Sequence, residues 1–199
     1  MTHYYDEKPQ GEIIEETFED KFYDRIFSFV SASGLFSKKH VDLASKLLIN
    51  KCDLENCETI LDLGCGWGPV VTVLSAVNPT KEFFASDINE RALTYTRKNL
   101  KKNNARAKLS KSNILKTYIG KKFDCILTNP PYVAGREVCY QFIIDSFDHL
   151  NEGGSLQLVA RHQKGGKMLA KKMEEVFSNV EDIAKKSGFR IYKSVKNSK

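Results

Sequence analysis

Between residues 59 and 195, two hydrophobic periods alternate, and this alternation limits the possible folds more than any other feature. Strand-like segments lie near 59–63, 82–86, 108–111, 123–128, 154–160, 179–183 and 189–195. Segments with helical spacing lie between them, at 68–77, 89–103, 136–150 and 164–177. The pattern predicts an α/β fold of Rossmann-like type, in which a seven-stranded, mostly parallel sheet carries helices on both faces. The four residues 185–188 are too short for a crossover, so we expect an antiparallel last strand.

The first fifty residues follow a different pattern. The segment Ile26–Ser37 alternates like a strand and then turns, and a helix with apolar residues at Val41, Ala44, Leu47 and Leu48 follows it. Ser37 is the expected N-cap of that helix. We therefore predict that residues 1–50 form an N-terminal extension, a strand hairpin and a helix, packed on a core of residues 51–199 within a single globular domain.

The first strand of the core, 59–63, breaks into a glycine-rich turn and then a helix. Alternating glycines let the backbone touch a ligand, because a side chain at Gly64 or Gly66 would block the approach. Free N–H groups at the start of the next helix favour a negatively charged ligand group. We expect this turn to bind a cofactor through Asp62, Gly64, Cys65, Gly66, Trp67 and Gly68.

The second strand ends at Asp87, about twenty residues beyond the last glycine, which is the spacing of a carboxylate that grips ribose hydroxyls. A strand-ending aspartate before a helix is more often a cap or a solvated turn residue, but together with the glycine turn the binding role is favoured. Ile88 follows it. At the end of the third strand, Asn113 and Ile114 form either a second part of the cofactor site or an ordinary turn.

The most specific signal is Asn129-Pro130-Pro131-Tyr132, directly after the fourth strand. Two prolines fix two φ angles, so the Asn129 side chain and the nearby carbonyls become a rigid set of acceptors. Such acceptors would orient an amide or exocyclic amino nitrogen, a poor nucleophile, for attack on an activated methyl group, and Tyr132 would stack on the planar target. The alternative is a tight turn after a buried strand.

Taken in order, these segments resemble class I methyltransferases, and within them the small-domain family that includes ribosomal RNA small-subunit methyltransferase C. The likeness extends to His3-Tyr4-Tyr5, Gly34–Lys38, Ser112-Asn113, Phe177–Val180 and Gly188–Arg190. It implies S-adenosylmethionine as cofactor, with its adenine near Asn113 and with Phe36 and Ser37 near the pocket. It also implies guanine N2 of ribosomal RNA as the target. Tyr132-Val133 departs from the Phe-His of the bacterial enzymes, which leaves the nucleotide open.

Other targets share the same tetrapeptide. Glutamine methylation in a protein is one alternative, although the known enzymes carry a helical N-terminal domain that residues 1–50 do not supply. Adenine or cytosine amino methylation is another, but no domain that reads a nucleic-acid sequence is evident. Methylation of cytosine C5 is disfavoured because it needs a cysteine nucleophile, and Cys125 lies inside a predicted strand. A protein that only binds RNA or a partner would be expected to lose the cofactor-binding residues or the acceptor loop Asn129–Tyr132. Both are intact in this sequence.

Charge and composition add weaker constraints. The net charge is +6, and the stretch from Arg91 to Lys122 holds eleven basic and no acidic residues, which indicates either an RNA contact or a solvated helix face. Arg161 and His162 end the fifth strand, where they would contact RNA phosphate or form a polar strand end.

Cysteine and histidine spacing indicates no metal site, because the five cysteines contain no C-x-x-C pair. The sequence also lacks a signal peptide and an apolar run long enough for a membrane helix, so a cytoplasmic protein is expected. Whether the protein is a monomer or a homodimer stays open.

Overall fold

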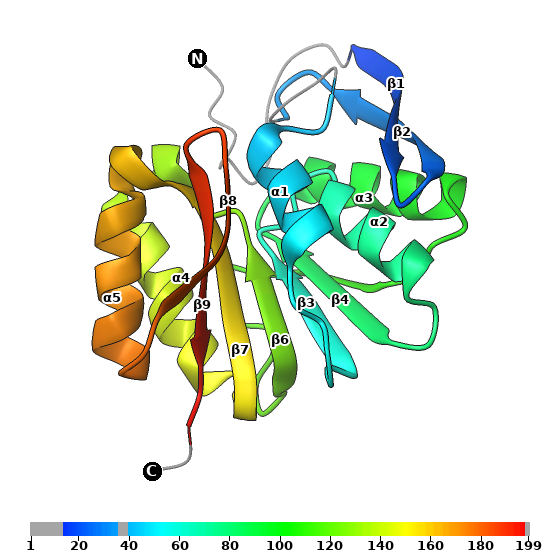
Figure 1. Ribbon diagram of the computed structural model, residues 1–199. Helices are drawn as coiled ribbons and strands as arrows, with labels where there is room; N and C mark the ends of the chain where they lie inside the picture. Colours follow the sequence, from blue (N-terminus) through cyan, green and yellow to red (C-terminus); the bar gives the residue numbers. More distant parts are fainter. Residues whose placement is uncertain (1–13, 36–39, 198–199) are drawn as a thin grey trace.

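A computed structural model describes residues 14–35 and 40–197, and a seven-stranded sheet forms its centre (Figure 1). The strand order is β5-β4-β3-β6-β7-β9-β8, and only β9 runs antiparallel to its neighbours. This confirms the predicted fold class. The strands are β3 (Thr59–Leu63), β4 (Glu82–Asp87), β5 (Lys108–Lys111), β6 (Phe123–Thr128), β7 (Leu150–Arg161), β8 (Glu181–Lys186) and β9 (Phe189–Val195).

Helices cover both faces of this sheet, and each face has its own apolar core (Figure 1). On one face, α1, α2 and α3 pack against side chains such as Ile60 and Val159. On the other face, α4 and α5 pack against Leu61, the residue after Ile60, and Leu158, the residue before Val159. Neighbouring residues of a strand point to opposite faces of the sheet, so each strand contributes to both cores. The helices are α1 (Leu43–Lys51), α2 (Pro69–Val77), α3 (Glu90–Lys102), α4 (Arg136–Asp148) and α5 (Lys167–Phe177).

A separate hairpin, β1 (Glu15–Phe22) and β2 (Arg25–Ala32), lies beside α3 (Figure 1). Tyr23 and Asp24 form its two-residue turn with φ values of 48° and 58°, as a hairpin turn with the twist of its strands requires. Two amides of α3 bind its backbone. Asn99 bonds both the N–H and the C=O of Val30, at 2.8 and 3.0 Å, and Asn103 does the same to Ser28, at 3.0 and 2.8 Å.

The helix after the hairpin begins later than the sequence suggested. Its N-cap is Asp42, whose side chain accepts hydrogen bonds from the N–H groups of Ala44 and Ser45, both at 3.0 Å. The prediction of Ser37 as the cap was therefore wrong, and Ser37 itself lies outside the described residues. Val41 fits the helical apolar spacing and is buried, but it lies before the cap.

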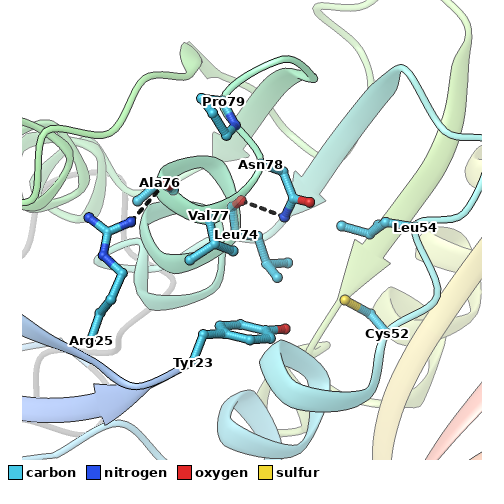
Figure 2. Close-up of a pocket in the computed structure, with 9 residues that line it drawn as sticks. All are labelled: Tyr23, Arg25, Cys52, Leu54, Leu74, Ala76, Val77, Asn78 and Pro79. Atoms are coloured by element: carbon cyan, nitrogen blue, oxygen red, sulfur yellow. Dashed lines mark hydrogen bonds between the residues drawn. The ribbon is translucent and has the colours of Figure 1, made fainter.

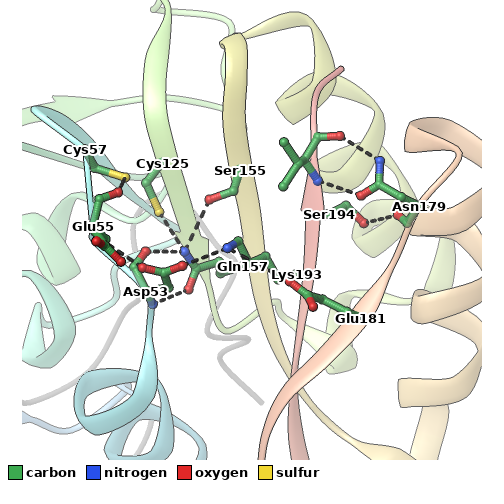
Figure 3. Close-up of polar contacts among 11 residues, drawn as sticks. Asp53, Glu55, Cys57, Cys125, Ser155, Gln157, Asn179, Glu181, Lys193 and Ser194 are labelled. Carbon is green, nitrogen blue, oxygen red and sulfur yellow. Dashed lines mark hydrogen bonds and ion pairs between the residues drawn. The ribbon is translucent and has the colours of Figure 1, made fainter. Parts of the chain in front are cut away.

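Two other predicted boundaries also differ from the structure. The strand predicted at 179–183 begins at Glu181, since the Asn179 amide pairs with the backbone of Val195 at 2.8 Å in both directions (Figure 3). The helix predicted from 164 begins at Lys167, because residues 162–166 form a wide turn in which Gly165 has a φ of +97°. The predicted strand 154–160 is part of a longer one, β7.

A buried amide joins the segment after α1 to the sheet (Figure 3). Gln157 of β7 accepts a hydrogen bond from Asp53 N at 2.8 Å and donates to Asp53 O at 2.5 Å. Lys193 of β9 adds an ion pair of 2.7 Å to the Asp53 carboxylate. These contacts join the residue after the C-cap of α1 to β7 and β9. In the part of the chain that the structure describes, no helix is long and apolar enough to cross a membrane.

Candidate active site

The parallel strands β3, β4, β5 and β6 end at one edge of the sheet, and the turns after them surround a cavity of about 690 Å³. In open α/β sheets ligands bind at this edge. The cavity brings together the predicted residues Asp62, Gly64, Cys65, Gly66, Trp67, Asp87, Ile88, Asn113, Ile114, Asn129, Pro130, Pro131 and Tyr132. The predicted neighbours Phe36 and Ser37 lie outside the described residues.

The glycine turn closes the first side of the cavity. Gly64, Gly66 and Gly68 have φ values of +73°, +60° and +82°, which L side chains rarely adopt. The N–H groups of Gly64 and Cys65 both bond to the Ser86 carbonyl at 2.9 Å, so the turn is anchored to β4. Gly68 is not among the residues that line the cavity, and a Cβ there would lie 2.6 Å from the Thr96 side chain. Its glycine thus permits α2 to pack against α3.

Asp87 links the end of β4 to the glycine turn. One carboxylate oxygen accepts from Gly66 N at 2.9 Å and the other from Asn89 N at 2.8 Å. Burial raises the pKa of Asp87, and the hydrogen bonds from Asn89 and Gly66 oppose that rise. The helix after it is capped by Asn89, so Asp87 is not the cap that the alternative interpretation required.

Asp62 is the second buried carboxyl at this edge. It lies on β3 and accepts a hydrogen bond from Val71 N, in the first turn of α2, at 3.1 Å. The pKa of Asp62 is raised to about 7, mainly by burial; the hydrogen bond from Val71 opposes the rise and the nearby Asp87 adds to it. A site with two such carboxyls favours a ligand that carries positive charge or hydroxyl donors.

The tetrapeptide lines the cavity next to the glycine turn. Asn129 follows β6 and is partly buried, and the Thr128 hydroxyl before it bonds to the Leu63 carbonyl at 2.9 Å. That bond places the end of β6 beside the glycine turn. The Pro130 carbonyl accepts a hydrogen bond from Tyr132 N at 3.0 Å, which uses one of its two lone pairs. The Tyr132 side chain is 38% exposed, so its ring is accessible to a planar ligand.

The sequence of this chain is similar to those of known methyltransferases. Residues 26–193 match the family described as Methyltransferase small domain. The chain belongs to this methyltransferase family. It is 35% identical to the uncharacterized protein YbxB of Bacillus subtilis over 98% of both chains. It is 31% identical to Ribosomal RNA small subunit methyltransferase C of Pseudoalteromonas translucida, over 86% of this chain and 50% of that protein.

The solved structures agree on the fold. The 16S rRNA N2 G1207 methyltransferase of T. thermophilus, in complex with AdoMet and guanosine, matches 96% of this chain with a TM-score of 0.79 at 22% identity. This chain covers 52% of that structure, so it spans about half the length of the methyltransferase C relatives. The predicted family, the S-adenosylmethionine-dependent methyltransferase class and the cofactor are confirmed.

The groups that line the cavity of this methyltransferase fit S-adenosylmethionine. Backbone with positive φ at Gly64 and Gly66 faces it without side chains, and the Asp87 carboxylate provides acceptors for hydroxyl groups. Ile88 and Ile114 supply apolar surface beside Asn113 for a planar base. Ile114 has a φ of 56°, which is uncommon for a β-branched residue and is typical of a constrained functional turn.

Several residues that line the cavity were not predicted from the sequence. Phe142 of α4 and Phe189 of β9 come from elements far along the chain, and Asp42 and Ser45 come from the start of α1. A signal for Asp42 was present, since aspartate is a preferred N-cap residue before a helical apolar pattern. The choice of Ser37 as the cap obscured it.

The two basic residues proposed at the end of β7 separate in the structure. Arg161 lines the cavity together with Lys164, and its guanidinium lies 5.3 Å from the Phe189 ring centre. His162 Nδ1 lies 2.7 Å from the Tyr192 hydroxyl, and His162 is not among the lining residues. None of the basic residues between Arg91 and Lys122 lines the cavity either, and Lys98, Lys108 and Lys111 form ion pairs with glutamates.

Cys125 is not placed to act as a nucleophile for cytosine C5. Cys125 is fully buried within β6, and burial raises the pKa of its thiol well above the ordinary value. No three potential ligand side chains among residues 14–35 and 40–197 come together to hold a metal ion.

A second hollow of about 660 Å³ lies at the other end of α2 (Figure 2). It is lined by Tyr23, Arg25, Cys52, Leu54, Leu74, Ala76, Val77, Asn78 and Pro79. Arg25 donates to the Ala76 carbonyl at 3.2 Å, and no aspartate or glutamate lines this hollow. It therefore lacks the acceptors that the first cavity offers.

Proposed function

We propose that this methyltransferase methylates the exocyclic amino nitrogen N2 of guanine in ribosomal RNA. The observation that carries the proposal is the position of Asn129 and Pro130, whose acceptors follow β6 and share one cavity with the glycine turn after β3. The two strands are neighbours in the sheet, with Leu63 opposite Thr128. An amino group held by these acceptors would therefore lie next to a methyl donor held by the turn.

The residues of the chain divide into two groups by what they would do. Gly64, Gly66 and Asp87 would hold the donor, and bound S-adenosylmethionine would supply an activated methyl group. The Asn129 side-chain oxygen and the Pro130 carbonyl would accept the two amino hydrogens of the base. Those bonds orient the nitrogen lone pair, which is otherwise delocalised into the ring, toward the donor. Tyr132 would stack on the base.

Ribosomal RNA is supported by the relatives and by the charges at the mouth of the cavity. The relatives at about 30% identity are named ribosomal RNA small subunit methyltransferases, and one solved neighbour is titled as an N2 guanine methyltransferase. Arg161 and Lys164 line the cavity and are suited to phosphate. Cations at this position would help to hold the target nucleotide while the base enters between Tyr132 and Asn129.

The test is a methylation assay with purified protein, labelled S-adenosylmethionine and unmodified ribosomal RNA, either naked or in small-subunit particles. Nucleoside mass spectrometry should detect N2-methylguanosine, and the Asn129→Ala variant should give none. N6-methyladenosine or N4-methylcytidine as the sole product would replace guanine as the target. Label that enters a glutamine-containing protein substrate and never RNA would replace the RNA proposal altogether.

A further inference from the structure

The start of α1 reaches the tetrapeptide. Asn129 Nδ2 donates to Asp42 Oδ1 at 3.4 Å and to Ser45 Oγ at 3.3 Å, across 87 and 84 residues of sequence. Asp42 and Ser45 both line the cavity, and Ser45 is buried. Asp42 Oδ1 also accepts from the N–H groups of Ala44 and Ser45, so the helix itself fixes that oxygen in place.

The identity of the partner determines which end of the Asn129 amide it accepts. An ionised carboxylate only accepts hydrogen bonds, so the NH₂ end must face Asp42 and the carbonyl end must face away from it. In the part of the chain that is described, no residue donates a hydrogen bond to Asn129 Oδ1. The carbonyl oxygen therefore keeps both lone pairs for a ligand in the cavity.

The orientation matters because the two ends of an asparagine amide have nearly the same shape and opposite hydrogen-bonding character. The terminal torsion of asparagine is broad, so an unsupported amide samples both orientations. In the reversed orientation the NH₂ group would face the amino hydrogens of the substrate, and no hydrogen bond would form between two donors. A methyl acceptor would then be poorly aligned.

We propose that Asp42 and Ser45 are positioning residues that fix the Asn129 amide with its oxygen toward the substrate amino group. This inference rests on the proposed role of Asn129 as an acceptor. It assigns a part of the active site to the segment before the core, through α1, and it explains why this polar pair lines the cavity. Neither residue has to touch the substrate for this role.

The key variants separate helix capping from amide orientation. Serine is a good N-cap, so Asp42→Ser retains the cap but removes the charged acceptor that reaches Asn129. Ser45→Ala removes the second acceptor. In the double variant, the single-turnover rate on the RNA that the wild type methylates should fall about 10–100-fold, the range for loss of a hydrogen bond to a charged group. The dissociation constant for S-adenosylhomocysteine should stay within about twofold. The single variant Asp42→Asn keeps an oxygen acceptor at this position, so it should retain much of the wild-type single-turnover rate.

A matched control is Asp53→Ser, which makes the same change at another aspartate near α1. Asp53 accepts from Glu55 N at 3.0 Å and from Lys193 at 2.7 Å, and it does not line the cavity. Its replacement should lower the melting temperature and leave the methylation rate unchanged. A wild-type rate in the double variant, or equal rate losses in the double variant and Asp53→Ser, would overturn the inference.

A second measurement needs no RNA. In ¹⁵N-labelled protein, the Asn129 side-chain NH₂ signals can be assigned by their loss in Asn129→Ala. In the double variant these signals should shift and exchange with solvent faster than in the wild type. Unchanged signals would refute the positioning role even if the RNA substrate proved wrong, whereas changed signals with no methylation of any RNA by the wild type would count against the proposed function alone.

Discussion

The two hollows at opposite ends of α2 have nearly the same volume, about 690 and 660 Å³, yet they differ in what the helix offers to each. At the N-terminal end the cap is Gly68, which provides no side-chain hydrogen bond. At the other end two of the last carbonyls have partners outside the helix. Asn78 bonds to Leu74 O through its backbone and side chain, at 3.0 and 2.9 Å, and Arg25 bonds to Ala76 O (Figure 2).

The difference shows that size alone does not identify a binding site. A helix end leaves unsatisfied backbone groups that side chains, water or ligands must meet. At one end of α2, Asn78 and Arg25 bond to the carbonyls of Leu74 and Ala76. At the other end Asp62 accepts from Val71 N, and this end opens onto a cavity that also receives the ends of β3, β4 and β6. Four experiments test this contrast between the two hollows, in order of decreasing expected effect.

Asn129→Ala removes the proposed acceptor from the first cavity. Turnover should fall about 1,000-fold, as for loss of a group that aligns and stabilises the reacting atoms, while donor affinity stays within about twofold. Single-turnover rates and calorimetry with S-adenosylhomocysteine measure the two quantities. An equal loss of rate and of donor affinity would mean that Asn129 serves the donor and not the acceptor.

Asp87→Ala removes the carboxylate that would hold the donor. S-adenosylhomocysteine should bind about 100-fold more weakly, because charged hydrogen bonds to hydroxyls are lost and the turn at Gly66 loses its partner. Asp124→Ala is the control at the opposite end of the sheet, where that carboxylate bonds to the backbone N–H groups of Glu58 and Thr59. Equal weakening by both changes would show a general loss of structure and not a lost contact.

Asp62 predicts a dependence of stability on pH. Its pKa is raised by burial from 3.8 to about 7, so the folded state holds the proton more tightly than the unfolded state. The contribution to the free energy of unfolding is therefore full below about pH 4 and is lost as the pH rises toward 7. Denaturant titrations without ligand should show a loss of at least about 1.4 kcal/mol over this range relative to Asp62→Asn. Parallel curves for both proteins would contradict the raised pKa.

Arg25→Ala tests the second hollow and should have the smallest effect. It removes the bond to Ala76 O and the contact of the guanidinium with the Phe27 ring, at 5.5 Å, which should lower the free energy of unfolding by about 1 kcal/mol. Turnover and donor affinity should stay within about twofold. A tenfold loss of methylation without a change in melting temperature would indicate that this hollow also serves the reaction.

The local motifs were predictable because their chemistry is contained in short stretches. The glycine turn, Asp87 and the tetrapeptide each follow a strand, and parallel strands bring their carboxyl ends to one edge. The sheet and its antiparallel last strand followed from periodicity and from the short link at residues 185–188.

Contacts between distant segments could not be predicted in this way. The bonds from Asn129 to Asp42 and Ser45 and the bridge from Gln157 to Asp53 join residues more than eighty positions apart, and hydrophobic periodicity carries no signal for such pairs. The start of β8 was misjudged for a related reason, because the Asn179 side chain imitates a strand backbone.

The amides of Asn99 and Asn103 have a consequence for the order in which the protein is made. They bind β2 at Val30 and Ser28, and the two pairs are separated by 69 and 75 residues. At a synthesis rate of about 5–20 residues per second, the hairpin emerges from the ribosome roughly 4–14 seconds before α3 is complete. During that interval the backbone groups of Ser28 and Val30 that later bond to α3 and its C-cap have only water as partners, so this edge of the hairpin stays open until residue 103 is made.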